Sequence, residues 1–246
     1  MRLLLLRHGQ THGNTAGALD TAAPGLPLTQ LGHRQAEAAA RALVDHGIEQ
    51  IFVSTLARTH QTAAPLASTL GLEPRVLDGL REIAAGDFEM ATDDESILGY
   101  IGTVADWIEG RFDTRMPGGE TGHEFLARYD AAVLEIQRTL EEAGQSRALL
   151  VSHGAAIRTW VAARVAGVET HAKATDPLHN TACIELVGDP VAGWEIHAWH
   201  SEPVGGAFLD DVTAPDPTGQ GTDEVVEHAH EAGHERPEHE PDHAQK

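Results

Sequence analysis

The stretch Leu3-Leu4-Leu5-Leu6-Arg7-His8-Gly9-Gln10-Thr11, with Asn14 shortly after it, decides the expected fold. Its four leucines are too few for a membrane span or a signal-peptide core, and they suit a strand buried on both faces of a parallel sheet. In open α/β sheets, ligands bind beyond the carboxyl ends of the strands, so we expect Arg7 and His8 at a functional site. Gly9 permits a sharp turn and is expected to leave its N–H free for an anion.

The same order of residue types returns in Ala148-Leu149-Leu150-Val151-Ser152-His153-Gly154. It predicts a second buried strand that ends in an imidazole and a glycine, followed by a packed helix over residues 157–166. A single histidine after a strand is usually structural. Two in the same arrangement, one of them beside an arginine, favour a shared site at one crevice, with His8 and His153 facing each other.

Composition limits the classes of protein that the chain can represent. Its 246 residues, 41% of them hydrophobic, are enough for one sizeable α/β domain. A formal net charge of −21 argues against a nucleic-acid partner and against an anionic membrane surface. The single cysteine, Cys183, lies in an apolar run and is interpreted as a small buried residue. Without a targeting segment or a long apolar run, we expect a soluble, cytoplasmic protein.

An ordered set of motifs gives the chain a resemblance to a known family. It comprises Arg7-His8-Gly9-Gln10-Thr11 through Asn14, Pro27-Leu28-Thr29 with Gly32 and Gln35-Ala36, Ser54 through Arg58 with Gln61-Thr62-Ala63, Glu82, Gly118-Gly119-Glu120 and Ser152-His153-Gly154. From about Met1 to Trp199 the chain resembles the phosphatase branch of the histidine phosphatase superfamily, which has the phosphoglycerate mutase-like fold. The resemblance implies an α/β fold, a three-layer α/β/α sandwich around a mostly parallel sheet.

The phosphate site implied by this resemblance consists of Arg7, Asn14, Arg58, His153 and Gly154. Arg58 is predicted near the start of a helix, where free N–H groups and the helix dipole favour anions. Taken alone, Arg58 could equally be a solvated helix arginine. The resemblance makes it the second phosphate-binding arginine, whose forked guanidinium suits two phosphoryl oxygens.

The implied reaction uses His8, Glu82, Arg7 and His153, and requires no metal or other cofactor. His8 attacks phosphorus as a neutral imidazole, which needs one ring nitrogen free and the other donating its proton, expected to be to a backbone carbonyl. Glu82 resembles the family's general acid, which protonates the leaving oxygen and then activates water. Without the resemblance, Glu82 would be a surface glutamate paired with Arg81. Asp87 and Glu89 are weaker candidates for the acid.

Two variable segments are expected to select the substrate. The loop over residues 14–29 carries Asp20 and Thr21, interpreted as substrate-binding, although similar phosphatases often have glutamine where Asp20 stands. Residues 91–116 form a predicted lid, in which Trp107, Ile108 and Phe112 could pack over the site. Similar mutases carry a longer, basic insertion there, so this short segment with an acidic start favours a phosphatase. Arg111 and Arg115 keep the mutase alternative open.

We therefore expect a bacterial, metal-independent phosphomonoesterase acting on a small-molecule phosphomonoester. A phosphomutase and a non-catalytic binding protein with the same fold are the alternatives, and a homodimer is left open. The domain is expected to span residues 1–202, followed by an acidic, disordered tail at 203–246. The tail could hold Zn²⁺ or Ni²⁺ weakly, though a solvated tail is the preferred interpretation; its histidines are His228, His230, His234, His239 and His243. Within the domain, no metal-ligand pattern is evident in His171, His179, His197 and His200.

Overall fold

A computed structural model describes residues 1–222, apart from the side chains of Val168, Glu169 and His171. The strands within this part are β1 (Arg2–Arg7), β2 (Gln50–Val53), β3 (Arg75–Val76), β4 (Arg147–Ser152), β5 (Cys183–Asp189) and β6 (Gly193–His200). The α-helices are α1 (His12–Ala16), α2 (Gln30–Leu43), α3 (Ala57–Leu70), α4 (Asp94–Ile108), α5 (Gly122–Ala143), α6 (Gly154–Arg164) and α7 (Val168–Thr175). Short 3₁₀ turns lie at η1 (Val44–His46), η2 (Asp78–Leu80), η3 (Gly86–Phe88) and η4 (Ala207–Leu209).

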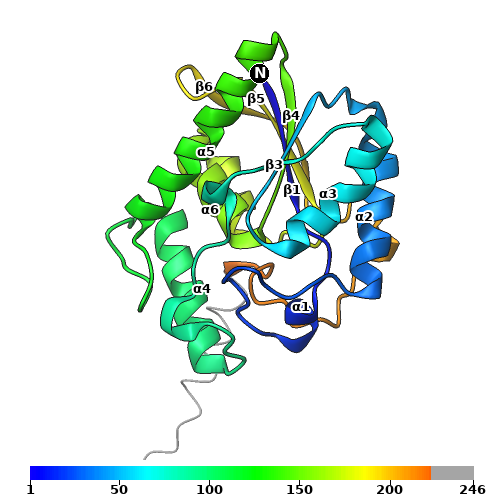
Figure 1. Cartoon of the computed structure of the whole chain (residues 1–246). Helices are drawn as coiled ribbons and strands as arrows, with labels where there is room; N and C mark the ends of the chain where they lie inside the picture. Colours follow the sequence, from blue (N-terminus) through cyan, green and yellow to red (C-terminus); the bar gives the residue numbers. More distant parts are fainter. Residues whose placement is uncertain (223–246) are drawn as a thin grey trace, which may run out of the picture.

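The six strands form one sheet in the order β3-β2-β4-β1-β5-β6. Strands β1 to β4 pair in parallel, while β5 and β6 extend the sheet as an antiparallel hairpin beside β1. Helices α2 and α3 cover one face, and α4, α5 and α6 cover the other (Figure 1). This arrangement confirms the expected α/β/α sandwich with a mostly parallel sheet.

The leucines of β1 supply both hydrophobic cores. Successive side chains of a strand point to opposite faces. Leu3 and Leu5 accordingly pack in the larger core under α4, α5 and α6, and Leu4 and Leu6 pack in the smaller core under α2 and α3. All four are at most 1% exposed. The unbroken apolar run is therefore the signature of a central strand with both faces covered.

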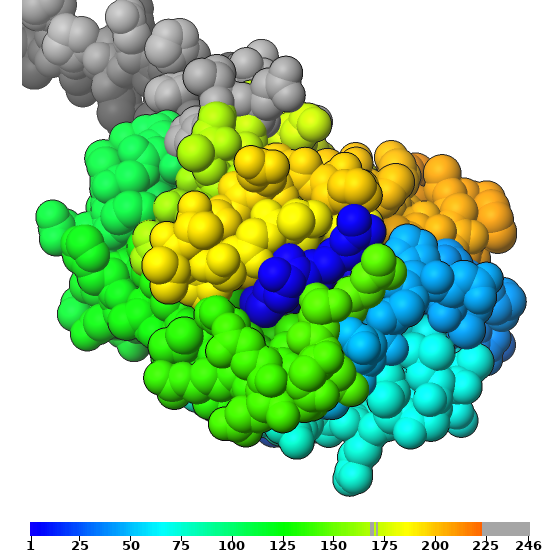
Figure 2. Space-filling model, turned by 90° about the horizontal axis from the view of Figure 1, so that it is seen from above, coloured from blue at the N-terminus to red at the C-terminus, as the bar shows by residue number. Residues whose placement is uncertain are grey.

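The register of β1 and β4 sets the position of the site. Leu6 pairs with Val151 and Arg7 with Ser152, so the next residue on each strand, His8 or His153, leaves the sheet at the same level. At the opposite end of the sheet, the first residues lie between the β5–β6 hairpin and the chain that leads into β4 (Figure 2).

Two glycines bring the first turn of the site against α2. A side-chain carbon on Gly9 would lie 2.7 Å from the carbonyl oxygen of Gly32, and one on Gly32 would lie 2.1 Å from that of Gln10. Both distances are too short for a real contact. Main chain therefore packs directly on main chain where β1 enters the site.

The prediction of a disordered tail is wrong for residues 203–222, which are ordered and which we call the C-terminal strap. The strap folds back beneath the carboxyl ends of the strands, beside α1 (Figure 1). Its amides and carbonyls bond to the domain: Asp216 N donates to Asn14 O at 3.2 Å, and Leu178 N donates to Gly219 O at 3.0 Å. This packing could not be predicted from the sequence, because the strap lacks apolar periodicity. The predicted tail over residues 223–246, with its histidines, lies outside the described residues.

The predicted lid over residues 91–116 contains α4, but its aromatic residues do not lie over the site. Trp107 is fully buried and stacks on Phe125 of α5, with ring centroids 5.8 Å apart, and Phe112 packs against the same core. They belong to the hydrophobic core because α4 docks on the domain through its apolar face. No helix within residues 1–222 is long and apolar enough to cross a membrane.

Candidate active site

The two predicted histidines meet at the carboxyl edge of the sheet. The ring centroids of His8 and His153 are 5.2 Å apart and the ring planes are inclined by 60°. His8 is 1% exposed, and His153 is fully buried. The convergence expected from two matching strand ends is therefore present, although the two residues are 145 positions apart in the sequence.

The hydrogen bond of His8 fixes its neutral tautomer. Nδ1 lies 2.8 Å from the carbonyl oxygen of Gly9, and because a carbonyl can only accept, Nδ1 carries the proton. Among the described residues, none forms a hydrogen bond with Nε2. Burial, followed by the positive charges of Arg58 and Arg7, holds the pKa of His8 well below its usual value. His8 is therefore a neutral imidazole with an unprotonated Nε2 at pH 7.

His153 is also neutral, but both of its ring nitrogens have partners. Nε2 lies 2.8 Å from Ser54 Oγ, and Arg58 donates through Nε to Nδ1 at 3.3 Å. Because Nδ1 accepts this bond, the ring proton lies on Nε2, which donates a hydrogen bond to Ser54 Oγ. Burial, followed by the charges of Arg58 and nearby His8, lowers its pKa well below the usual value. His153 thereby orients Arg58.

Arg58 occupies the first turn of α3, as the sequence predicts, and is not a solvated helix arginine. It is 2% exposed, with Nη1 3.3 Å from Asp20 Oδ2 and Nη2 donating to the Asp20 carbonyl at 2.9 Å. Burial lowers its pKa, and the Asp20 carboxylate opposes that shift. The guanidinium remains charged because even a lowered arginine pKa lies above neutral pH. Asp20 therefore lies in the site as a partner of Arg58.

Glu82 is fully buried, and its carboxylate lies at the start of α6. Oε1 accepts from the amides of Ala156 at 2.8 Å and Ile83 at 2.9 Å, while Oε2 accepts from Ala155 at 3.3 Å. Burial raises its pKa, and the Ile83 amide, Arg58 and the Ala156 amide oppose the shift. Glu82 is thus not the surface partner of Arg81, which pairs instead with Asp78 at the surface. A buried carboxyl with a raised pKa suits a proton donor.

Arg7 and Asn14 are both buried and share one anionic partner. Arg7 donates from Nη1 and Nη2 to the two carboxylate oxygens of Asp216 at 2.7 Å each, and Asn14 Nδ2 donates to Asp216 Oδ1 at 2.6 Å. Asn14 is held in this orientation by bonds to its Oδ1 from the amide of Thr11 and from Asn180. The structure therefore brings both residues together around an anion, which here is a carboxylate of the strap.

The remaining predicted residues have different positions. The Gly9 amide is not free for an anion, because it donates to Thr62 Oγ1 at 2.9 Å. Thr21 donates from its amide to Glu89 Oε1 at 2.9 Å, and its hydroxyl contacts the same carboxylate. Thr21 and Glu89 therefore hold one another. Gly154, the first residue of α6, lies close to Arg7, since a side-chain carbon there would be 3.0 Å from Arg7 Nε.

Sequence reasoning missed Ser54 and Asp216 as site residues. Ser54 directly follows β2, so its place at the same sheet edge was a signal that could have been used. Asp216 lies in a stretch of acidic and turn-forming residues that offers no comparable signal.

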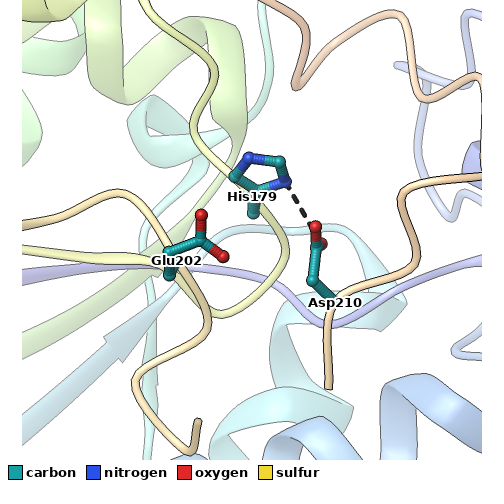
Figure 3. Close-up of side chains that lie close together, drawn as sticks. All are labelled: His179, Glu202 and Asp210. Carbon is teal, nitrogen blue, oxygen red and sulfur yellow. Dashed lines mark ion pairs between the residues drawn. The ribbon is translucent and has the colours of Figure 1, made fainter. Parts of the chain in front are cut away.

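A second cluster lies outside the site, at the base of the strap. Ligating atoms of His179, Glu202 and Asp210 all lie within 4.8 Å of one another. Figure 3 shows the imidazole of His179 directed at Asp210, where Nδ1 lies 3.1 Å from Oδ1, with Glu202 beside the pair. No spacing pattern in the sequence predicts this grouping. The pairing of His179 with Asp210 explains why these two side chains lie together. This pair fastens the strap to the loop before β5.

The fold and the site define an α/β protein in which a neutral, buried histidine pair lies beside two arginines at the carboxyl edge of a parallel sheet. Such an arrangement suits the binding of a phosphoryl group.

Comparisons with known proteins agree with this description. The family model of the histidine phosphatase superfamily (branch 1) matches residues 3–202, and the chain belongs to this superfamily. The "Probable phosphoglycerate mutase GpmB" of Yersinia pestis is 31% identical over 216 residues, which are 88% of this chain and 98% of that protein. The PE-PGRS family protein PE_PGRS11 of Mycobacterium tuberculosis is 38% identical over 221 residues, but the chain spans only 37% of its length.

A solved structure of mycobacterial glucosyl-3-phosphoglycerate phosphatase Rv2419c in complex with VO3 is similar to the chain, with a TM-score of 0.68 and 30% identity. The match covers 81% of this chain and 98% of that one. Phosphatases and mutases therefore both occur among the relatives, and the protein is an enzyme of this superfamily.

Proposed function

We propose that the protein is a metal-independent phosphomonoesterase that forms a phosphohistidine on His8. The observation that carries the proposal is the tautomer of His8: Nδ1–H is bonded to the Gly9 carbonyl, and Nε2 keeps its lone pair. Arg7 and Arg58 supply the positive charge that stabilises a transferring phosphoryl group, so the scheme needs no metal ion.

In the first step, His8 Nε2 attacks phosphorus and the bond from phosphorus to the leaving oxygen breaks. Glu82 gives that oxygen its proton, for which its raised pKa prepares it. Arg7, Arg58 and Asn14 bind the equatorial oxygens, together with the amide of Gly154. His153 holds Arg58 in place, because its Nδ1 accepts from Arg58 Nε.

In the second step, water replaces the imidazole at phosphorus. The Glu82 carboxylate takes a proton from the water, the oxygen attacks, and the bond between phosphorus and Nε2 breaks. Inorganic phosphate leaves, and Glu82 and His8 return to their starting protonation states. The cycle consumes one water and one phosphomonoester.

Two arginines of residues 91–116 support a phosphatase over a mutase. Arg111 pairs with Asp106 and Glu109, and Arg115 pairs with Glu124. Both arginines are more than half exposed, at 54% and 55% of their side chains, and are already committed to surface carboxylates. Their guanidinium groups are therefore poorly placed to bind the second phosphate that a mutase requires. The mutase remains the second candidate because of the match to GpmB.

The test is a product assay on the purified protein. We expect release of inorganic phosphate from p-nitrophenyl phosphate, and isomerisation of 3-phosphoglycerate with added bisphosphoglycerate to be negligible beside it. Dominant isomerisation with negligible phosphate release would establish the mutase instead. A complete set of site residues without turnover of either substrate would favour the non-catalytic alternative.

A panel of small phosphomonoesters then identifies the substrate class. Phosphoglycerate derivatives belong in the panel because a structural relative is a glucosyl-3-phosphoglycerate phosphatase. Asp20 and Thr21 are proposed to contact the part of the substrate beyond the phosphate, since the loop that carries them lies against Arg58. Cytoplasmic location and any dimer remain separate proposals, to be tested by fractionation and by sedimentation.

A further inference from the structure

The C-terminal strap places a carboxylate on the residues assigned to phosphate. Asp216 accepts from both terminal nitrogens of Arg7 and from the amide of Asn14. Its side chain is 16% exposed, and that of Arg7 is fully buried. The strap begins where the match to the superfamily model ends, at residue 202.

The pairing leaves Arg7 little with which to bind a substrate. Besides the two bonds to Asp216, Nη1 donates to Leu178 O at 2.7 Å and Nη2 lies 3.4 Å from Thr218 Oγ1. Only Nε–H is without a hydrogen-bond partner among the described residues, and it is buried. A phosphoryl oxygen would therefore find the terminal edge of the guanidinium and the Asn14 amide already occupied.

The strap also packs against Arg7 and the start of α6, beside the buried His8. The carbonyl oxygen of Thr218 lies 2.5 Å from the position that a side-chain carbon on Gly154 would take, and a side-chain carbon on Gly219 would lie 2.0 Å from Arg7 Nη1. These contacts place residues 216–219 directly over Arg7 and the start of α6. Since His8 is 1% exposed and Glu82 is fully buried, a substrate can reach them only after some covering segment moves.

Asp216 has an unusual backbone conformation, in a turn that the strap holds by its own hydrogen bonds. Its φ of +33° lies in the left-handed region, which a non-glycine residue seldom adopts. The turn is held by bonds from the amides of Gly219 and Gln220 to the Asp216 carbonyl, at 3.0 and 3.2 Å. A carboxylate carries one negative charge, whereas a phosphomonoester carries up to two and offers three oxygens, so the substrate is the stronger ligand for the same donors.

We infer that Asp216 is an intramolecular competitor for the phosphoryl group, which lowers the affinity of the resting enzyme and leaves Arg7 and Asn14 when substrate binds. The inference rests on the proposed function insofar as that function places phosphate at Arg7. The alternative role, in which Asp216 positions Arg7 for the substrate, makes the opposite prediction for affinity.

Calorimetric titration with inorganic phosphate tests the inference without requiring turnover. Asp216→Asn keeps the size of the side chain and removes its charge, so we expect phosphate to bind about tenfold more tightly than to the wild type. Asp113→Asn is the matched control: it removes an exposed carboxylate that lies outside the strap and pairs with His123, and the affinity should not change. Equal or weaker binding by Asp216→Asn overturns the competitor role.

Hydrogen exchange on the wild-type protein keeps the test independent of whether the variant folds. Saturating inorganic phosphate should speed exchange of the Gly219 and Gln220 amides at least about threefold, while the amides of β1 stay unchanged. Unchanged or slower exchange at those two amides contradicts the inference. If phosphate binds as inferred but no phosphomonoester is hydrolysed, the proposed function fails and the competitor role stands.

Discussion

The two strand ends that form the site share a sequence pattern and differ in their hydrogen bonds. His8 donates once, to the carbonyl of the next residue, and its Nε2 is unprotonated. His153 has a partner on each nitrogen, Ser54 and Arg58. Burial and the same arginines lower both pKa values. Both rings are neutral and end equivalent strands, but the proton lies on Nδ1 in His8 and on Nε2 in His153, so the proposed difference in role comes from the neighbours of each ring.

Replacing His8 gives the largest expected effect. His8→Ala removes the proposed nucleophile, and the rate of p-nitrophenyl phosphate hydrolysis should fall by at least about 10⁴-fold. Steady-state assays of the variant measure this, with circular dichroism to confirm folding. His123→Ala is the control, because His123 is exposed and lies against Asp113 and Phe112, outside the site. Retention of a tenth of the wild-type activity by His8→Ala would mean that another group attacks phosphorus.

The next effect concerns the proton rather than the nucleophile. Glu82→Gln cannot protonate the leaving oxygen, so hydrolysis of an alkyl phosphate should slow by about 10²–10⁴-fold. The loss of kcat/KM, which reports the steps up to release of the leaving group, should be much smaller for p-nitrophenyl phosphate, whose leaving group needs no proton. Glu135→Gln serves as the control, since Glu135 is exposed on α5, outside the site. Equal losses for the two substrates would remove the general acid role from Glu82.

His153→Ala should lower the rate less than His8→Ala does. The variant leaves Arg58 without the ring that orients it, and such a loss typically costs about 10²–10³-fold. Ser54→Ala removes only the support of His153 Nε2, and we expect about a tenfold decrease. Steady-state kinetics of the three variants give the order. A larger loss for His153→Ala than for His8→Ala would reverse the roles assigned to the two rings.

The last expected effect is on the free energy of unfolding, to which both histidines contribute. Their lowered pKa values keep them neutral in the folded state, while the unfolded chain takes up protons below about pH 6.5. The free energy of unfolding should therefore fall as the pH drops from about 6.5 toward the lowered values, by up to about 1.4 kcal/mol per pH unit for each ring. Glu82 acts in the opposite direction: its raised pKa stabilises the folded state at low pH, and this contribution is lost as the pH rises.

Urea unfolding at pH 7, 6 and 5 measures this dependence. The double variant His8→Gln with His153→Gln lacks both titrating rings and retains Glu82, so its stability should fall less steeply over the same range. The same slope for the variant and the wild type would show that other groups dominate the acid response.

Much of the sheet and half of the site could be predicted from local patterns. The leucines of β1 and the matching end of β4 predict two buried strands, and parallel strands meet at one edge, so His8 and His153 had to approach each other. The identities of Arg58 and Glu82 as site residues came instead from the resemblance. No local pattern distinguishes a buried Glu82 from a surface glutamate, because the amides that hold it belong to α6, more than 70 residues away.

The ordered packing of the strap could not be predicted from its amino-acid composition. Its acidic residues and turn formers indicate a solvated chain, yet it is held by single polar contacts, such as the bond from Gln35 Nε2 to Leu209 O at 2.9 Å. Such contacts depend on where distant donors lie after folding. The predicted lid position of Trp107 and Phe112 was wrong for a related reason. An apolar side chain fits a lid and a core equally well, and only the docking of α4 decides between them.

The close approach of Gly9 to Gly32 restricts which substitutions this protein can accept during evolution. At each position the obstacle to a larger residue is a peptide group, and every amino acid carries the same peptide group. No second substitution elsewhere can therefore make room for a methyl group at Gly32. Genetic screens for suppressors of Gly32→Ala should return revertants to glycine, while suppressors of damage in the apolar cores should be found readily.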